Sequence, residues 1–142
     1  MRRTVHIAFV LMLPMLCASL LHAKEEPLDK LVQRAQNEND PKLLARVVDR
    51  YADLAHDLYG QGDSATAIAD ANEAVAFAVK SRDAANAHTN KIKDAEILLR
   101  KAQRTLQELA RAADLDDRPP LEQAAAQISR LRDDMLNVMF GK

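Results

Sequence analysis

The segment Asn39–Asp63, NDPKLLARVVDRYADLAHDLYGQGD, carries the signals for one complete helix and for the turn that follows it. Asp40 can cap the amino end of a helix, and Pro41 stands where its missing N–H group is not needed. Apolar side chains then recur in steps of four and three, at Leu44, Val48, Tyr51, Ala55 and Leu58. The glycines of Gly60-Gln61-Gly62 end this pattern, because glycine readily adopts the left-handed conformation at a helix end. The segment therefore predicts a helix from residue 41 to about residue 59.

Beyond this turn, Asp63 can cap a second helix, and no glycine or proline follows until Pro119. The apolar rhythm keeps one heptad phase from residue 64 to residue 113, across a stretch of weak helix formers at residues 81–90. Two arrangements fit this pattern. A break near residues 81–90 gives a bundle of four similar helices, whereas an unbroken helix would be roughly 75 Å long. We expect the unbroken helix, because a loop has no reason to keep the phase.

The two ends of the segment 24–142 each predict one further helix. Pro119-Pro120 opens the last helix and Gly141 closes it. Its expected buried face comprises Leu121, Ala124 or Ala125, Ile128, Leu131, Met135, Val138 and Met139. A shorter helix is expected over residues 28–38. The fold class is therefore all-α: an antiparallel helical bundle or a long helical hairpin of three to five helices.

Composition supports a single helical domain and excludes some partners. The chain has 142 residues with only 3 Gly, 5 Pro and 4% aromatic residues, a poor composition for strands and tight turns. Its 20 Lys and Arg balance 21 Asp and Glu, so no field of one sign exists to attract a polyanion. We therefore expect no nucleic-acid partner.

The amino terminus has the layout of a secretory signal peptide over residues 1–23. A basic start at Arg2-Arg3 precedes an apolar stretch, and the small residue Ala23 stands before charged residues. Cleavage there would remove Cys17, the chain's one cysteine, and leave residues 24–142 as a periplasmic or secreted domain. The alternative is an uncleaved segment that holds the protein on a membrane.

Residues 48–80 resemble a single tetratricopeptide-repeat hairpin. The positions that match its spacing are Tyr51, Leu54, Ala55, Leu58, Gly62, Ala67 and Ala71. Tyr51 stands where that family has tryptophan, and Val79 stands where it has proline. The resemblance implies peptide or protein binding in a groove, without catalysis.

Alanine is concentrated between Ala65 and Ala87, where ten of the residues are alanine. Small side chains let helix backbones approach closely, so this stripe could receive a partner helix. The candidate partner-binding residues are Ala67, Ala71, Ala74 and Ala78. The alternative, which we favour, is an internal seam between helices of this chain.

Polar residues suggest only weak candidates for chemistry. Arg82 and His88 interrupt the apolar phase, and they are candidates for a polar bundle interior that carries a small molecule or a metal. Asp53, His56 and Asp57 are better explained as a solvated face than as a metal site. The sequence has no Gly-x-Ser-x-Gly motif and no glycine-rich phosphate loop, so we expect neither an enzyme nor a cofactor.

These observations favour an exported, non-catalytic helical protein that binds or scaffolds in the bacterial cell envelope. Its partner would be another envelope protein or a second copy of the chain. The alternative is the small-molecule or metal carrier.

Overall fold

The computed structural model describes residues 25–141 as an all-α protein. The predicted signal peptide, residues 1–23 with Cys17, lies outside these described residues. The helices and one short 3₁₀ turn are α1 (Leu28–Glu38), α2 (Pro41–Gly60), α3 (Ser64–Ala85), η1 (Thr89–Lys91), α4 (Ile92–Ala112) and α5 (Arg118–Phe140). The predicted helical fold class is therefore confirmed, and the helices at 28–38 and 41–60 begin and end close to the predicted residues.

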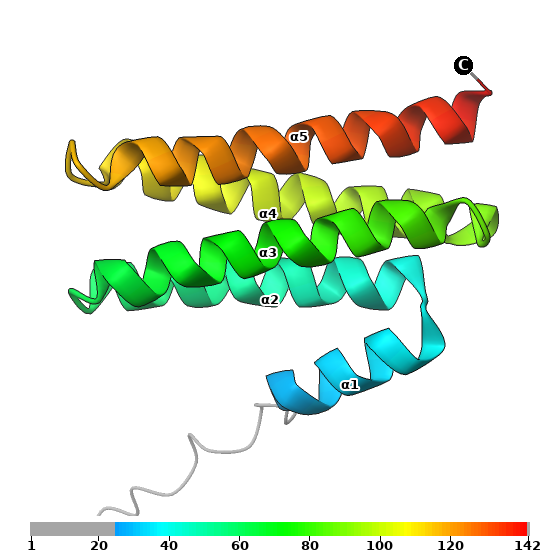
Figure 1. Ribbon diagram of the computed structural model, residues 1–142, viewed down its shortest axis with the longest axis horizontal. Coiled ribbons are helices and arrows are strands. Elements are labelled where there is room, and N and C mark those ends of the chain that lie inside the picture. Colours follow the sequence, from blue (N-terminus) through cyan, green and yellow to red (C-terminus); the bar gives the residue numbers. More distant parts are fainter. Residues whose placement is uncertain (1–24, 142) are drawn as a thin grey trace, which may run out of the picture.

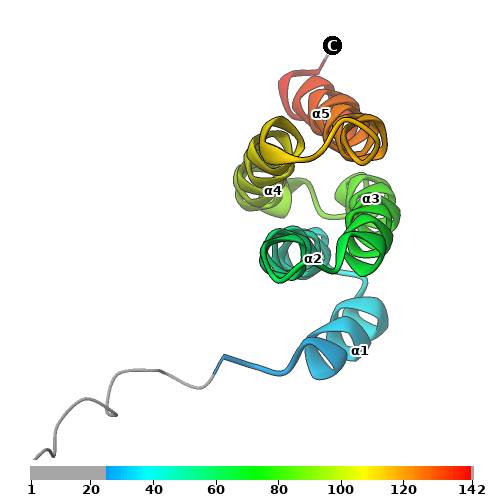
Figure 2. The ribbon, with the colours of Figure 1, turned by 90° about the vertical axis from the view of Figure 1, so that its left-hand side faces the viewer.

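Two antiparallel hairpins, α2–α3 and α4–α5, are stacked on each other (Figure 1). In the end view, α2 and α4 form one layer while α3 and α5 form the other (Figure 2). Helix α2 packs against both α3 and α4, and α5 packs against α4 and α3. Helix α1 packs on α2 at the end of the stack. The amino ends of α2 and α4 therefore lie in one layer, and their side chains can face the same surface.

The predicted caps define the α2–α3 hairpin. The Asp40 carboxylate accepts hydrogen bonds from the backbone N–H groups of Lys42 (2.8 Å) and Leu43 (3.3 Å). At the other end of α2, Gly62 has a φ of 89°, and the N–H of Asp63 donates to the carbonyl of Leu58 at 3.0 Å. This left-handed glycine closes the helix and reverses the chain within a few residues.

The predicted unbroken helix over residues 64–113 is wrong, because the chain turns back between α3 and α4. Tight bonds from Ala87 N–H to the Ala84 carbonyl and from His88 N–H to the Ala85 carbonyl end α3. The turn lies among Asn86, Thr89 and Asn90, which favour helices only weakly. Folding back lets α4 bury its apolar face against α2 and α5, which a single long helix could not do.

One hydrophobic cluster runs through all five helices. The fully buried side chains contributed by α4 and α5 are large, among them Ile92, Leu99, Leu106, Leu121 and Ile128. Those contributed by α3 are mostly alanines. The predicted buried face of α5 is confirmed as far as Met135, but Val138 and Met139 are 41% and 36% exposed. In Figure 1 the last turns of α5 diverge from α3 and α4, the helices against which α5 packs.

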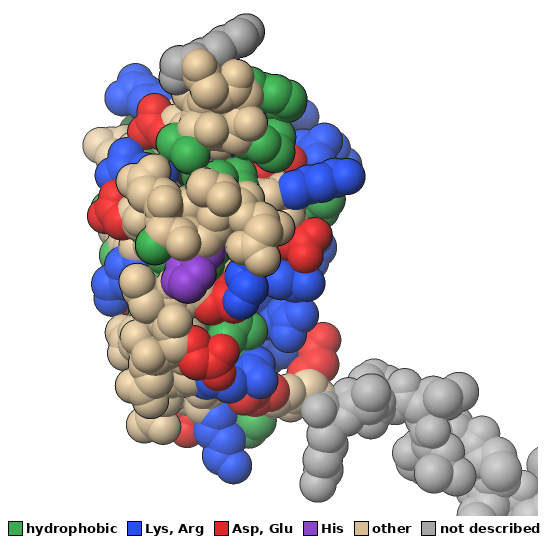
Figure 3. Space-filling model, turned by 90° about the vertical axis from the view of Figure 1, so that its right-hand side faces the viewer, with side chains coloured by type: hydrophobic (Ala, Val, Ile, Leu, Met, Phe, Trp, Pro, Cys, Tyr) green, Lys and Arg blue, Asp and Glu red, His purple; other side chains and the backbone are tan. Residues whose placement is uncertain are grey.

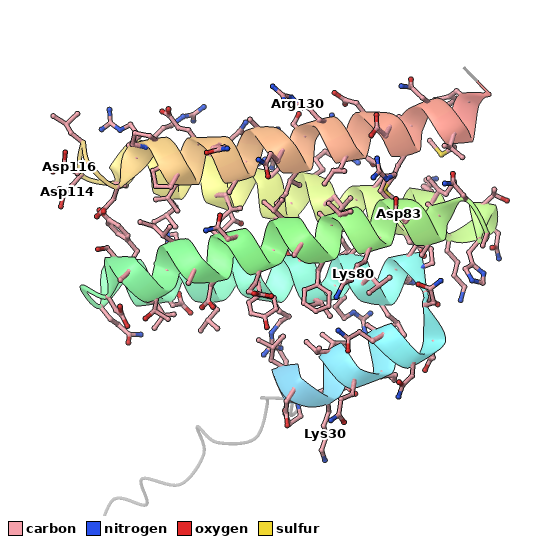
Figure 4. All side chains as sticks on the ribbon, viewed as in Figure 1. Lys30, Lys80, Asp83, Asp114, Asp116 and Arg130 are labelled. Atoms are coloured by element: carbon pink, nitrogen blue, oxygen red, sulfur yellow. The ribbon has the colours of Figure 1, made fainter. Side chains whose placement is uncertain are left out.

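Polar contacts join the two hairpins at both ends of the stack. At one end, the Lys91 ammonium group pairs with the Asp40 carboxylate. At the opposite end, the Tyr59 hydroxyl accepts a hydrogen bond from the Asp114 N–H (2.9 Å) and donates one to the Asp117 carboxylate (3.1 Å). Figure 4 shows Asp114 in the connection between α4 and α5. The stacking of the hairpins therefore does not depend on apolar contact alone.

Candidate functional site

The four candidate partner-binding alanines do not form a free surface. Ala67, Ala71, Ala74 and Ala78 are each at most 1% exposed and belong to the hydrophobic cluster. Helix α3 packs closely on α2, so these residues form the internal seam that the sequence also allowed. The candidate partner-binding surface at these positions is therefore corrected, since a partner cannot reach side chains that the chain itself covers.

The candidate polar interior at Arg82 and His88 is also wrong. The Arg82 guanidinium pairs with the carboxylates of Asp83 (2.6 Å) and Asp134 (2.9 Å), and these two lie on α3 and α5 near the surface. Figure 4 shows Asp83 on α3 beside α5. His88 lies in the connection from α3 to η1 and is partly exposed. Arg82 therefore has its own counter-ions at the rim of the stack, and it needs no ligand.

The end of the molecule that carries the α3–α4 connection has no single chemical character. Figure 3 shows basic and acidic side chains interspersed over this end, together with a histidine. Some apolar side chains are visible near the carboxyl end of α5. A mixture of both charges is typical of a solvated surface rather than of a binding site.

A groove along α2 and α4 is the best candidate for a functional site. Three adjoining cavities of about 450, 290 and 370 Å³ share lining residues along this face. No residue of α3 or α5 lines them, so the groove lies on the side of α2 turned away from the alanine seam. Their lining residues are Glu25, Glu26, Leu28, Leu31, Arg46, Asp49, Arg50, Asp53, Leu54, His56, Asp57, Leu98, Lys101, Thr105 and Glu108.

A row of three carboxylates on α2 forms one wall of this groove. Asp49, Asp53 and Asp57 are four residues apart, which places them one above another on the same helix face. From α4, the Lys101 ammonium group reaches Asp49 at 2.8 Å and Asp53 at 3.4 Å. Asp57 has only the His56 ring beside it, at 3.7 Å. Lys101 therefore pairs with two of the three carboxylates in this row, and it does not reach the third.

Asp49 is the deepest charged group of the groove. It is 8% exposed, and its Oδ1 atom is buried without a hydrogen-bond partner among the described residues. Burial raises the pKa of Asp49 even though its ion pair with Lys101 acts in the opposite direction. The same ion pair raises the pKa of Lys101, whose side chain is far more exposed. The charged form of Asp49 is therefore poorly solvated in the groove.

Helices α1 and α2 also add apolar and basic side chains to the groove. Leu54 is 37% exposed and lines the largest cavity together with Leu28 from α1. Arg50 pairs with Glu25, in the segment before α1. The groove can therefore accept an apolar side chain next to a charged one.

The groove and the contacts of Lys101 could not be predicted from the sequence. Asp53, His56 and Asp57 were expected on a solvated face, and they are indeed partly or largely exposed, but they line a groove rather than a convex surface. The spacing of Asp49, Asp53 and Asp57 was the available signal, because like charges at this spacing repel one another. The contact with Lys101 lies about fifty residues away and has no local signal.

Neither a cluster of metal ligands nor a membrane-spanning helix is found in the part of the chain that the structure describes. No group of three or more His, Cys, Asp or Glu side chains within residues 25–141 is arranged to hold a metal ion. None of the five helices is both long enough and apolar enough to cross a bilayer.

Comparison of the chain with protein-family models, with curated proteins and with solved structures finds no match.

Proposed function

We propose that this chain is an exported, non-catalytic helical protein of the bacterial cell envelope that binds another protein through the α2–α4 groove. The observation that carries the proposal is the groove: it extends along two helices, combines charged side chains with the exposed Leu54, and is open to solvent. An extended or helical segment of a partner would fit such a surface better than a compact metabolite.

The arrangement of the hairpins gives further support. Residues 48–80, within α2 and α3, resemble a single tetratricopeptide-repeat hairpin, and the second hairpin is stacked on the first in the same orientation (Figure 2). In stacked helical repeats, an extended surface formed by equivalent helices of successive units is the usual binding surface. Here the equivalent helices are α2 and α4, which line the groove.

Site-specific photo-crosslinking tests the proposed binding surface. A photoreactive phenylalanine analogue at Leu54 is expected to crosslink a distinct envelope protein in living cells. The matched control is Leu115, which is 78% exposed in the α4–α5 connection and does not line the groove. The proposal fails if Leu54 gives no adduct, or if both positions give the same ones.

The export part of the proposal has a separate test. Residues 1–23 support export by their layout alone. Osmotic release of the periplasm followed by intact-mass measurement is expected to give a chain that begins at Lys24. Recovery of the full-length chain in the cytoplasm would contradict export without affecting the groove.

A further inference from the structure

The charge of the groove indicates what kind of partner segment it would accept. Its lining contains six carboxylates but only three permanently positive side chains. The carboxylates are Glu25, Glu26, Asp49, Asp53, Asp57 and Glu108, and the cations are Arg46, Arg50 and Lys101. The chain as a whole is nearly neutral, so this excess is a local property of the groove.

The excess is concentrated at the end of the groove farthest from α1. Asp53, Asp57 and Glu108 line one cavity of about 370 Å³ together with His56 and Thr105. Within residues 25–141, no lysine or arginine lies within ion-pair distance of Asp57 or Glu108. On α4, the residue one turn after Lys101 is Thr105, where a second lysine would have faced Asp57. Among the described residues, Asp57 and Glu108 therefore have no lysine or arginine as an ion-pair partner in this cavity.

The deeper part of the groove contains the cations, and it also contains a carboxylate that is not fully paired. Asp49 is more than nine-tenths buried, lines two of the cavities, and leaves one carboxylate oxygen without a hydrogen bond. Buried carboxylates are normally fully paired, because an unmatched acceptor costs stability. Asp49 therefore adds a buried negative charge to the groove, next to the exposed carboxylates of the same row.

We infer that the groove binds a basic segment of the partner protein, whose lysine or arginine enters the cavity of Asp53, Asp57 and Glu108 beside an apolar residue on Leu54. This inference rests on the proposed function and specifies its partner chemistry. Complementary charge would mainly speed association and exclude acidic segments, while the contact with Leu54 would add apolar burial.

A peptide-binding measurement tests the inference directly. The probe is a short fluorescein-labelled peptide that alternates lysine, leucine and glycine, and its matched control has glutamate in place of each lysine. Fluorescence anisotropy at physiological salt is expected to show binding of the lysine peptide only. Asp57→Asn and Glu108→Gln are each expected to weaken this binding about twofold to fivefold. Amide NMR shifts are expected at Asp53, Asp57 and Thr105.

The control variant is Asp116→Asn, which removes the same charge from the exposed α4–α5 connection (Figure 4). It is expected to leave binding unchanged. Equal weakening by Asp116→Asn would show nonspecific attraction and overturn the inference.

The remaining outcomes separate this inference from the proposed function. Equal binding of the glutamate peptide in the groove would overturn the basic partner and keep the groove as a binding surface. Failure of both peptides would also overturn the basic partner, and crosslinking from Leu54 would then decide the proposed function independently.

Discussion

Helix α2 has two very different sides. The side packed on α3 meets a row of alanines that are at most 1% exposed, whereas the opposite side carries Asp49, Asp53 and Asp57 along an open groove. The first side is held by close apolar packing, whereas Asp53 and Asp57 on the second side are partly or largely exposed and add little to stability. The difference teaches that the packed face of α2 and its proposed binding face lie on opposite sides of the helix, so the proposed binding face can be changed without disturbing the alanine seam.

The largest expected effect comes from placing a charge in the alanine seam. Ala71→Glu would bury a carboxylate without a partner and also add volume to a packed position, so we expect a loss of about 3 to 5 kcal/mol in unfolding free energy. Thermal unfolding followed by circular dichroism measures it. The matched variant Ala69→Glu, on the exposed face of α3, should change stability by less than about 0.5 kcal/mol. Similar melting temperatures for the two variants would mean that the seam is not packed as described.

An intermediate effect is expected from removing the groove's central cation. Lys101→Met leaves Asp49 without its ion-pair partner in a buried position. Because the lysine end of the pair is exposed and screened by water, we expect a loss of about 1 to 2 kcal/mol at neutral pH, below the cost for a fully buried pair. Lys93→Met, at an exposed position on α4, is the control and should have little effect.

The pH dependence of Lys101→Met gives a sharper test. The pKa of Asp49 is already raised by burial, and loss of the lysine would raise it further. A carboxyl group with a raised pKa in the folded state favours folding at low pH, and this contribution is lost as the pH rises through the folded pKa. The destabilisation by Lys101→Met should therefore shrink between neutral pH and about pH 4. A difference from the wild type that stays constant with pH would contradict the role given to Asp49.

The smallest effect is expected at the exposed end of the row. Asp57→Asn removes repulsion from Asp53, one turn away, so the melting temperature should rise by no more than about 2 °C. Differential scanning calorimetry at low salt measures this, and high salt should abolish it. A clear fall in the melting temperature would show that Asp57 stabilises the fold, contrary to the division between the two sides of α2.

Local chemistry made the helix ends predictable. Asp40, Gly62 and the Pro119-Pro120 pair act through their immediate neighbours, and the structure uses the aspartate and the glycine as predicted. The break between α3 and α4 was missed because Ala78, Ala85 and Ile92 keep a seven-residue spacing across it. All three are buried, but on two helices that run in opposite directions. A shared phase therefore shows which residues are buried and does not show that the helix is continuous.

The groove could not be predicted in the same way. Its walls come from helices whose pairing depends on the tertiary fold, and the contacts of Lys101 with Asp49 and Asp53 span about fifty residues. The sequence could show that Asp49, Asp53 and Asp57 share a face. It could not show that this face is concave, nor that α1 stops short of covering it.

The hydroxyl of Tyr59 makes the contacts between the two hairpins different at the two ends of the stack. One oxygen atom joins the end of α2 to the α4–α5 connection through a donated and an accepted hydrogen bond. Asp57, at one end of the groove, precedes Tyr59 by only two residues, about half a helical turn. The hydrogen bonds of the Tyr59 hydroxyl therefore hold the two hairpins together next to this end of the groove. At the opposite end the chain itself joins the two hairpins through the α3–α4 connection, and the side-chain contacts there include ion pairs such as Lys91 with Asp40, which dissolved salt can weaken. The Tyr59 hydrogen bonds therefore hold the end at which the stack can open.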